Sequence, residues 1–320
     1  MVINADANDK QPLVAYDVIV LYSATYLYLG AWVTDTGKMA DVIALHHHHC
    51  TDVVNKFAIF CQANTTMPFA VKKTVFEAVV VSSMTYSSET WLTNSIKPIE
   101  SCYNNMVRLL LGVRANTPIR LCLIEAGLEP FNHIVQMRRS QYLREKLNSV
   151  DMEQPFHYMF SRSRAANAAA SIFMVTASQY IRQSQLSDVI NDVAVNEQGS
   201  KFWNYREHLN PQLSVHPLYS SPVYIPDYIR ASFSRLRLMS HSLKVETGRW
   251  SRIPREQRLC DRCDRAVVQD EEHVLITCPH TQHLRQSNDH LNFMSLENLL
   301  GEVTHLRDLA NYVNEVLRAM

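Results

Sequence analysis

The chain of 320 residues carries 31 basic and 31 acidic side chains, so any contact with a polyanion must come from a local patch and not from overall basicity. Its first ten residues lack the basic start and apolar run of a signal peptide. The uncharged stretch 18–34 is interrupted by Tyr, Ser, Thr and Gly and is shorter than the ~20 apolar residues of a membrane helix, so we expect a soluble protein.

The N-terminal part predicts a β-hairpin followed by a long helix. Only 7 glycines and abundant Leu, Val, Ala, Met and Gln favour a mainly α fold. β-branched and aromatic residues dominate 14–22 and 26–33, and Ser23-Ala24-Thr25 between them predicts the turn of one short hairpin. From Lys38 to about Ala63 apolar residues recur at helical spacing, which predicts the first helix.

Proline and glycine mark the ends of further helices. Pro68 suits a first helical turn, and Gly112 and Gly127 stand where C-terminal caps belong. The helices are expected at 68–86, 98–111, 117–127 and 130–147. Together they predict a compact helical bundle beside the hairpin.

The middle of the chain carries weaker signals. Residues 165–177 are Ala-rich and favour a helix, whereas the polar residues near 198 and the stretch 211–226 are typical of linkers. A sixth clear helix is predicted from Pro226 to about Leu243, and a closing helix pattern runs from Leu296 to Leu317.

The most specific motif is C-x2-C-x9-H-x4-C, formed by Cys260, Cys263, His273 and Cys278. Two thiols separated by two residues can bind one tetrahedral ion, and the later His and Cys complete its shell. Four soft or borderline ligands with no open position favour a structural Zn²⁺ ion over a hydrolytic metal. The alternative is four unrelated residues in a reduced protein. We call residues 260–278 the knuckle.

The other four cysteines, Cys50, Cys61, Cys102 and Cys122, are scattered through helical patterns and do not suggest a disulfide framework. This usage predicts a reducing, intracellular compartment, the nucleus or the cytoplasm.

The segment from Arg230 to Arg265, here called the basic segment, is positively charged. It holds ten basic and four acidic residues, a net of six positive charges. Trp250 lies within it and offers a face on which a base can stack. Phosphate neutralisation and stacking favour nucleic-acid binding. The alternative is a solvated helix face whose arginines pair locally.

The run His46–His49 also invites a metal interpretation, because His46 and Cys50 lie one helical turn apart. No third and fourth ligands follow at matching spacing, so we expect His46 and Cys50 to pack on the bundle instead. The sequence contains no adjacent Asp-Asp pair, no glycine-rich phosphate loop and no Gly-x-Ser-x-Gly elbow. It therefore predicts no catalytic residues.

Several of these stretches resemble the reverse transcriptases of non-LTR (LINE-type) retrotransposons. YLYLGAWVTD at 26–35 looks like the hairpin that closes their palm, and YSSETW at 86–91 and YNNMVRLLLGVR at 103–114 resemble their helical thumb. GRWSRIPREQRLC at 248–260, with the rest of the knuckle, is similar to their C-terminal zinc-binding region. The resemblance covers most of 15–150 and 228–285.

The resemblance implies four consecutive parts: a palm-end hairpin remnant at 1–36, a thumb-like bundle at 37–150, a linker with possible helices at 151–225, and the basic helix, knuckle and C-terminal helix at 226–320. It further implies phosphate contacts from the thumb and RNA or DNA contacts beside the knuckle. The thumb candidates are Lys72, Lys73, Arg108, Arg114 and Arg120. The knuckle-side candidates are Arg249, Trp250, Arg252, Arg255 and Arg258.

The departure from the family concerns catalysis. The family's catalytic aspartates lie upstream of the hairpin, in a Tyr-x-Asp-Asp turn and an earlier palm strand, and this sequence contains neither element. We therefore expect a non-catalytic, zinc-stabilised fragment that binds template–primer or RNA. The alternatives are the C-terminal portion of an active RNA-directed DNA polymerase whose palm is encoded upstream or supplied in trans, and an inert remnant or scaffold.

Overall fold

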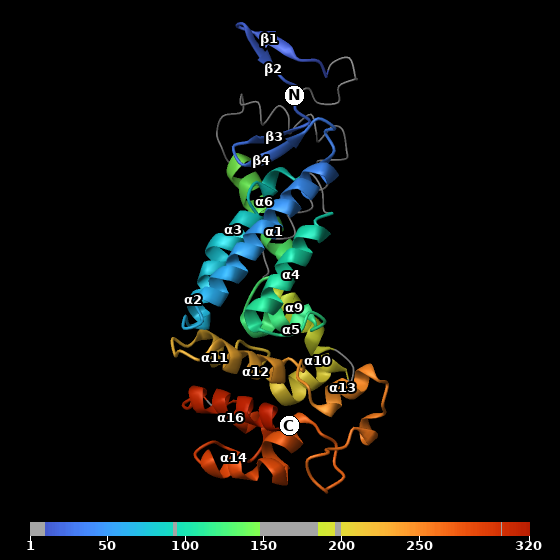
Figure 1. Cartoon of the computed structure of the whole chain (residues 1–320), viewed down its shortest axis with the longest axis vertical. Coiled ribbons are helices and arrows are strands. Elements are labelled where there is room, and N and C mark those ends of the chain that lie inside the picture. Colours follow the sequence, from blue (N-terminus) through green and yellow to red (C-terminus); the bar gives the residue numbers. More distant parts are fainter. Residues whose placement is uncertain (1–9, 92–94, 148–184, 196–199, 302) are drawn as a thin grey trace. The chain divides into compact units, whose positions relative to one another are not determined.

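A computed structural model of the chain describes residues 10–91, 95–147, 185–195, 200–301 and 303–320, and helices predominate among them (Figure 1). The strands are β1 (Leu13–Ala15), β2 (Val18–Val20), β3 (Thr25–Tyr28) and β4 (Ala31–Thr34). The α-helices of the first half are α1 (Met39–Ala63), α2 (Phe69–Val75), α3 (Ser82–Met84), α4 (Lys97–Leu111), α5 (Ile119–Ala126) and α6 (Phe131–Leu147).

The second half contains shorter helices. They are α9 (Gln185–Ala194), α10 (Lys201–Asn204), α11 (Pro217–Ser220), α12 (Asp227–Arg237), α13 (Lys244–Trp250), α14 (Gln282–Ser287), α15 (Leu296–Leu300) and α16 (Leu306–Ala319). A π-helical turn, η6 (His273–Thr277), precedes Cys278. Among the described helices, none combines the length and the apolar character that a membrane span requires.

The N-terminal strands form two hairpins, and the prediction of a single hairpin is wrong. β1 pairs with β2 and β3 pairs with β4, each antiparallel. Both turns contain two residues with positive φ: Tyr16 and Asp17 in the first, Leu29 and Gly30 in the second. Such turns match the twist of the flanking strands. The predicted turn at Ser23-Ala24-Thr25 instead joins the two hairpins. Tyr16-Asp17 contains no glycine to signal a turn, and Leu29-Gly30 lies inside the second predicted strand.

The five helices predicted before residue 150 are present, with their ends within a few residues of those expected. Gly112 ends α4 with a φ of 72°, and the amide of Val113 donates to the carbonyl of Arg108 across 3.0 Å. Gly127 ends α5 in the same left-handed conformation, and Leu128 donates to Leu123. These bonds satisfy carbonyls that the helix ends would leave free.

Chain contacts divide the protein into two compact units, each built from three separate segments. Unit 1 takes Met1–Phe57, Phe76–Asn104 and Pro130–Ser184, and unit 2 takes Ala58–Val75, Asn105–Glu129 and Gln185–Met320. The four consecutive parts expected from the sequence stay a prediction.

Unit 1 has an aromatic core. Ring centroids of Phe57 and Phe76 lie 5.6 Å apart, those of Phe76 and Tyr103 5.6 Å, and those of Tyr103 and Phe131 5.4 Å, which are favourable distances for tilted rings. These four rings come from α1, the π-helical turn Phe76–Val81, α4 and α6. They hold together helices that are far apart in sequence.

The histidine run on α1 contributes to that core as expected. His46 and Cys50 are both buried. The Nε2 atom of His46 lies 2.8 Å from the carbonyl oxygen of Met84, and its ring meets the edge of Trp91. Burial lowers the pKa of His46, so the buried imidazole is neutral. The exposed His48 lies beside Asp52 on the outer face.

Unit 2 is organised around α12. This helix buries Ile229, Phe233 and Leu236 and packs along α16 (Figure 1). Phe69 of α2 meets Tyr219 of α11 edge-on, with ring centroids 5.1 Å apart. Both helices therefore join the core of unit 2.

Three expectations for the second half need correction. Residues 211–226 do not have linker character, because Leu213, Leu218 and Ile225 among them are buried. The helix that begins after Pro226 ends at Arg237 and not near Leu243, and a positive φ at Met239 turns the chain. The closing pattern forms two helices, α15 and α16, instead of one. The Ala-rich stretch 165–177 lies outside the described residues.

Candidate metal centre and its basic surroundings

The four knuckle side chains converge. The ligand atoms of Cys260, Cys263, His273 and Cys278 all lie within 4.8 Å of one another, and Cys263 Sγ is 3.4 Å from His273 Nε2. A tetrahedral ion with zinc–sulfur bonds of about 2.3 Å separates its sulfur ligands by roughly 3.8 Å. The arrangement can therefore hold one metal ion, and both the donor set and the spacing are compatible with zinc.

The first pair of ligands sits on a tight loop closed by a short antiparallel bridge. Leu259 pairs with Val268, the amide of Cys260 donates to Val267 O across 2.8 Å, and Gln269 donates to Arg258 O across 2.9 Å. The chain reverses between these bonds. The reversal directs both thiols to the same side, which explains the C-x2-C spacing.

The second pair is placed by a π-helical turn. The amide of Cys278 donates to His273 O across 2.7 Å, the i to i+5 bond that defines η6. The amide of His273 is itself bonded to Asp270 Oδ1 at 3.0 Å, which fixes the start of the turn. A spacing of four residues between His and Cys therefore brings the two ligands together because this turn is wider than an α-helical one.

Outer contacts orient the ligands. His273 Nδ1 lies 3.1 Å from Thr277 Oγ1, so the other ring nitrogen is directed toward Cys263. Gln269 Nε2 approaches Cys260 Sγ at 3.8 Å, and Arg285 donates to Cys278 O at 2.6 Å. Such contacts are typical of metal ligands, because a coordinating imidazole usually donates its second N–H to a fixed partner.

The electrostatics of the group favour a cation. Burial raises the pKa of the Cys278 thiol to about 11, and the neighbouring Cys260 and Cys263 contribute to the increase. Burial also lowers the pKa of His273, and Arg265 and Arg285 act in the same direction. Thiolates so close to one another repel. A divalent ion is the species that would stabilise their charged form and accept the neutral imidazole.

Many basic side chains of the basic segment are paired with carboxylates, so fewer are available to bind phosphate than its composition suggests. Five of its ten basic side chains face a carboxylate within 4 Å. These pairs are Arg230–Asp227, Arg237–Glu125, Lys244–Asp261, Arg249–Glu246 and Arg255–Asp270. Arg230 and Arg237 are also buried, so they belong to the core and not to a binding surface.

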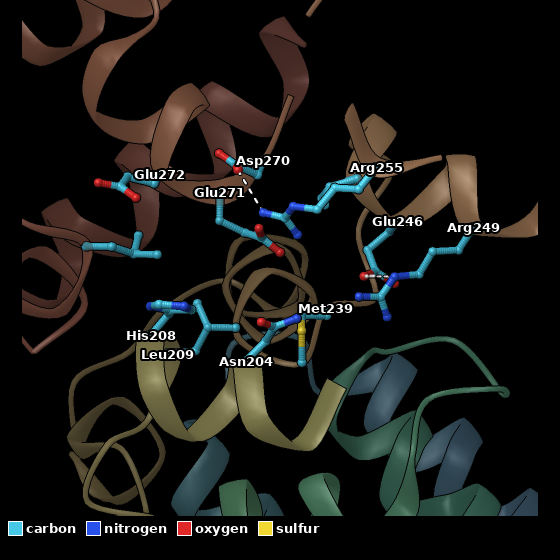
Figure 2. A pocket seen from close by; sticks show the side chains of 12 residues that line it. Asn204, His208, Leu209, Met239, Glu246, Arg249, Arg255, Asp270, Glu271 and Glu272 are labelled. Carbon is cyan, nitrogen blue, oxygen red and sulfur yellow. Dashed lines mark hydrogen bonds and ion pairs between the residues drawn. The ribbon is translucent and has the colours of Figure 1, made fainter. Parts of the chain in front are cut away.

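A charged cleft contains two of the predicted nucleic-acid contacts. Arg249 and Arg255 line it together with Glu246 and the acidic run Asp270-Glu271-Glu272, as Figure 2 shows. Arg255 reaches Asp270 at 3.0 Å and Arg249 reaches Glu246 at 3.5 Å. This acidic run follows Arg265 and lies outside the basic segment. The charge count of that segment therefore does not include the carboxylates that neutralise its arginines.

Arg258 has a structural role, because its guanidinium is bonded to backbone carbonyls. Its guanidinium donates to Val245 O at 2.7 Å and to Ile253 O at 2.6 and 2.8 Å. These bonds tie α13 to the strand-like residues that enter the knuckle. Because all three guanidinium nitrogens are committed to carbonyls, any contact with a phosphate must compete with them.

Trp250 and Arg252 are the most available of the predicted contacts. The Trp250 side chain is 56% exposed, and the guanidinium carbon of Arg114 lies 4.5 Å from its ring centroid. Arg252 is exposed and has no carboxylate partner among the residues that the structure describes. The structure thus brings Arg114, assigned to the thumb, next to Trp250, assigned to the knuckle side.

The remaining thumb candidates have internal partners. Lys72 is 1% exposed and pairs with Asp227 Oδ2 at 2.5 Å, which removes it from the surface and corrects its assignment as a phosphate contact. Lys73 donates to Gly127 O at 2.8 Å, and Arg108 donates to Thr117 O at 2.9 Å. Arg120 is exposed and forms an ion pair with Asp192.

In comparisons with known proteins, no family model, no curated protein and no solved structure matches the chain.

Proposed function

We propose that the chain is a non-catalytic part of a LINE-type reverse transcriptase that binds RNA or DNA next to a structural zinc ion. The observation that carries this proposal is the exposed Trp250, which stacks on Arg114, lies two residues from Arg252 and precedes the metal-competent knuckle by ten residues. An aromatic face flanked by guanidinium groups suits an unpaired base and the phosphates on either side of it.

The contact surface in this proposal is small. It comprises Arg114, Trp250 and Arg252, with Arg249 and Arg255 available only if they leave their carboxylate partners. Few phosphates are then neutralised, so the salt dependence of binding is shallow compared with that of a strongly basic protein. Stacking is tolerant of sequence, which predicts binding to single strands with little base preference.

Zinc has a structural role in this proposal. Cys260, Cys263, His273 and Cys278 hold the ion, and the ion fixes the loop that follows the Trp250 surface. Metal content measured by mass spectrometry of the purified protein tests this part directly. A chain purified without any bound metal from zinc-supplemented cells would contradict it.

The binding experiment measures affinity for single-stranded RNA, single-stranded DNA and duplex DNA over a salt series. Trp250→Ala removes the stacking face, which is worth about 1–3 kcal/mol per base. Arg252→Ala should reduce the salt slope by roughly one phosphate contact. Arg307→Ala is the matched control, since Arg307 is exposed on α16 and lies outside the basic segment.

Two outcomes oppose the proposal. One is the absence of binding even at low salt. The other is binding that is unchanged in both Trp250→Ala and Arg252→Ala while circular dichroism shows intact folding. The second outcome favours the scaffold alternative, in which the knuckle only holds helices together.

A second candidate function rests on the N-terminal hairpins. Their apolar side chains are unusually exposed, with Val14 at 74%, Ile19 at 65% and Tyr28 at 60%. Apolar strands of this kind are typical of surfaces that another domain covers. This favours the interpretation that the hairpins pack on a polymerase palm supplied by a longer reading frame or in trans. Coding sequence upstream that contains an in-frame Tyr-x-Asp-Asp turn would support it.

A further inference from the structure

A second group of metal-binding side chains lies outside the knuckle and has no motif in the sequence. His290 Nε2 lies 3.3 Å from Asp308 Oδ2, and His305 Nδ1 lies 3.9 Å from the same oxygen. The ligand atoms of all three residues fall within 4.8 Å of one another. The two imidazole rings meet edge to face, with centroids 4.9 Å apart.

The fold creates this juxtaposition from two segments. His305 and Asp308 are three residues apart at the start of α16, so their side chains project from one side of its first turn. His290 comes from the turn that follows α14, and α14 packs against α16 (Figure 1). The spacing between His290 and His305 is too long to form a recognisable ligand motif, so only the folded chain reveals the group.

We propose that His290, His305 and Asp308 bind a divalent transition ion such as Zn²⁺, Co²⁺ or Ni²⁺. Two imidazoles and one carboxylate suit these ions, whereas Mg²⁺ and Ca²⁺ prefer shells made of oxygen. The distance of 3.3 Å between imidazole nitrogen and carboxylate oxygen is the separation expected for two ligands bonded at about 2.0–2.2 Å to one ion in a tetrahedral shell.

This site differs in kind from the knuckle. Its side chains are between a third and a half exposed, and three protein ligands leave coordination positions for water or another small ligand. The ion should therefore exchange with solvent and bind more weakly than an ion held by three thiolates. When bound, it would link the turn after α14 to the first turn of α16.

The test counts zinc ions on the full-length chain by native mass spectrometry during a zinc titration. The expected result is a further ion beyond the one in the knuckle. His290→Ala and Asp308→Asn should each lower the affinity for that ion by at least about tenfold, because even the loss of an outer-shell partner lowers metal affinity by about 10–100-fold. Cobalt distinguishes the two sites, since thiolate ligands give intense charge-transfer bands that imidazole and carboxylate ligands lack.

The controls are His283→Ala and His48→Ala. Both remove exposed histidines, the first on α14 and the second in the histidine run of α1, and both should retain the further ion. The proposal is overturned if the wild-type chain takes up no ion beyond that of the knuckle, or if His290→Ala and Asp308→Asn retain it. The result does not depend on nucleic-acid binding, so either proposal can fail alone.

Discussion

Arg237 and Glu125 form an ion pair in the core of unit 2, with side chains only 3% and 0% exposed. Arg237 also donates to Leu209 O at 2.7 Å, and the hydroxyl of Tyr205 donates to Glu125 Oε2 at 2.6 Å. Burial raises the pKa of Tyr205 well above its ordinary value, and the charge of Glu125 adds to the increase, so the tyrosine remains a donor. Every charged atom of the pair thus has a local partner, as a buried ion pair requires.

Glu125→Gln should lower the free energy of unfolding by about 3–5 kcal/mol, because it leaves the Arg237 charge buried without a counterion. Urea denaturation measures the loss. Arg237→Met should be costly in a similar way. The double variant Glu125→Gln, Arg237→Met should lose clearly less than the sum of the two, since it removes both charges. Additive losses would show that the two groups do not act as a pair.

Removal of zinc should loosen the knuckle and spare the helices of unit 1. The amides of Cys260, Gln269 and Cys278 are bonded to carbonyls within residues 258–278, so hydrogen exchange at these positions should accelerate after chelation. Structural zinc contributes on the order of 10 kcal/mol to the folding of small finger peptides. The hydrogen bonds of the knuckle loop could not provide that much stability without the ion. Cys263→Ala should reproduce the effect.

The extent of the change can be mapped by limited proteolysis. New cleavage is expected between about residues 245 and 290, while α1 and α4 stay protected. The contact between the Tyr312 hydroxyl and Leu275 O joins α16 to η6, so some loosening of α16 is also expected. A digestion pattern that is the same with and without chelator would contradict the structural role of the metal.

Local signals explain which parts of the fold the sequence predicts. Helices up to residue 147 have periodic apolar positions and clear end signals, as at Gly112 and Gly127, and these signals act within a few residues. The knuckle is also local: its ligands fall within 19 residues, so their spacing alone indicates convergence. Both features require no knowledge of distant contacts.

The features that the sequence does not predict depend on distant partners. The positive charge of Arg237 counts toward a basic surface until the fold places Glu125, 112 residues away, against it. Lys72 is buried in the core, where its charge is paired with Asp227. His290 and His305 are ordinary surface residues until α14 and α16 pack together. In each case tertiary packing decides the role of a residue whose local pattern is uninformative.

His216 should make stability depend on pH. It is buried, its Nε2 lies 2.8 Å from Leu300 O, and its Nδ1 accepts the amide of Leu218. Burial, with a smaller effect of Arg237, lowers its pKa from 6.5 to about 4. The unfolded chain therefore takes up the proton first as the pH falls. Stability from this group is complete above pH 6.5 and is lost progressively down to about pH 4, by at most roughly 3 kcal/mol.

The variant His216→Asn isolates this contribution. His216 caps α11, and Asn, a favoured N-cap residue, should cap it as well without titrating in this range. The variant should be less stable at neutral pH, but its free energy of unfolding should fall less steeply between pH 6.5 and 4 than that of the wild type. Comparing the two slopes cancels the shared pH dependence of zinc binding. Parallel curves would show that His216 is not held neutral in the folded chain.

Gly248 should be intolerant of a side chain because of Arg258. A Cβ atom at Gly248 would lie 2.7 Å from both Cγ and Cδ of Arg258, closer than the packing of carbon atoms permits. The Arg258 side chain cannot move aside freely, since its guanidinium is bonded to Val245 O and Ile253 O. Gly248→Ala should therefore lower the free energy of unfolding by about 1–3 kcal/mol, the usual cost of overpacking, although alanine favours a helix. In a chain that also carries Arg258→Ala the clash is absent, so Gly248→Ala should be neutral or stabilising there. Thermal denaturation of the four chains measures this reversal, and an equal cost of Gly248→Ala in both backgrounds would refute the assignment of Arg258 as the clamp between α13 and the knuckle.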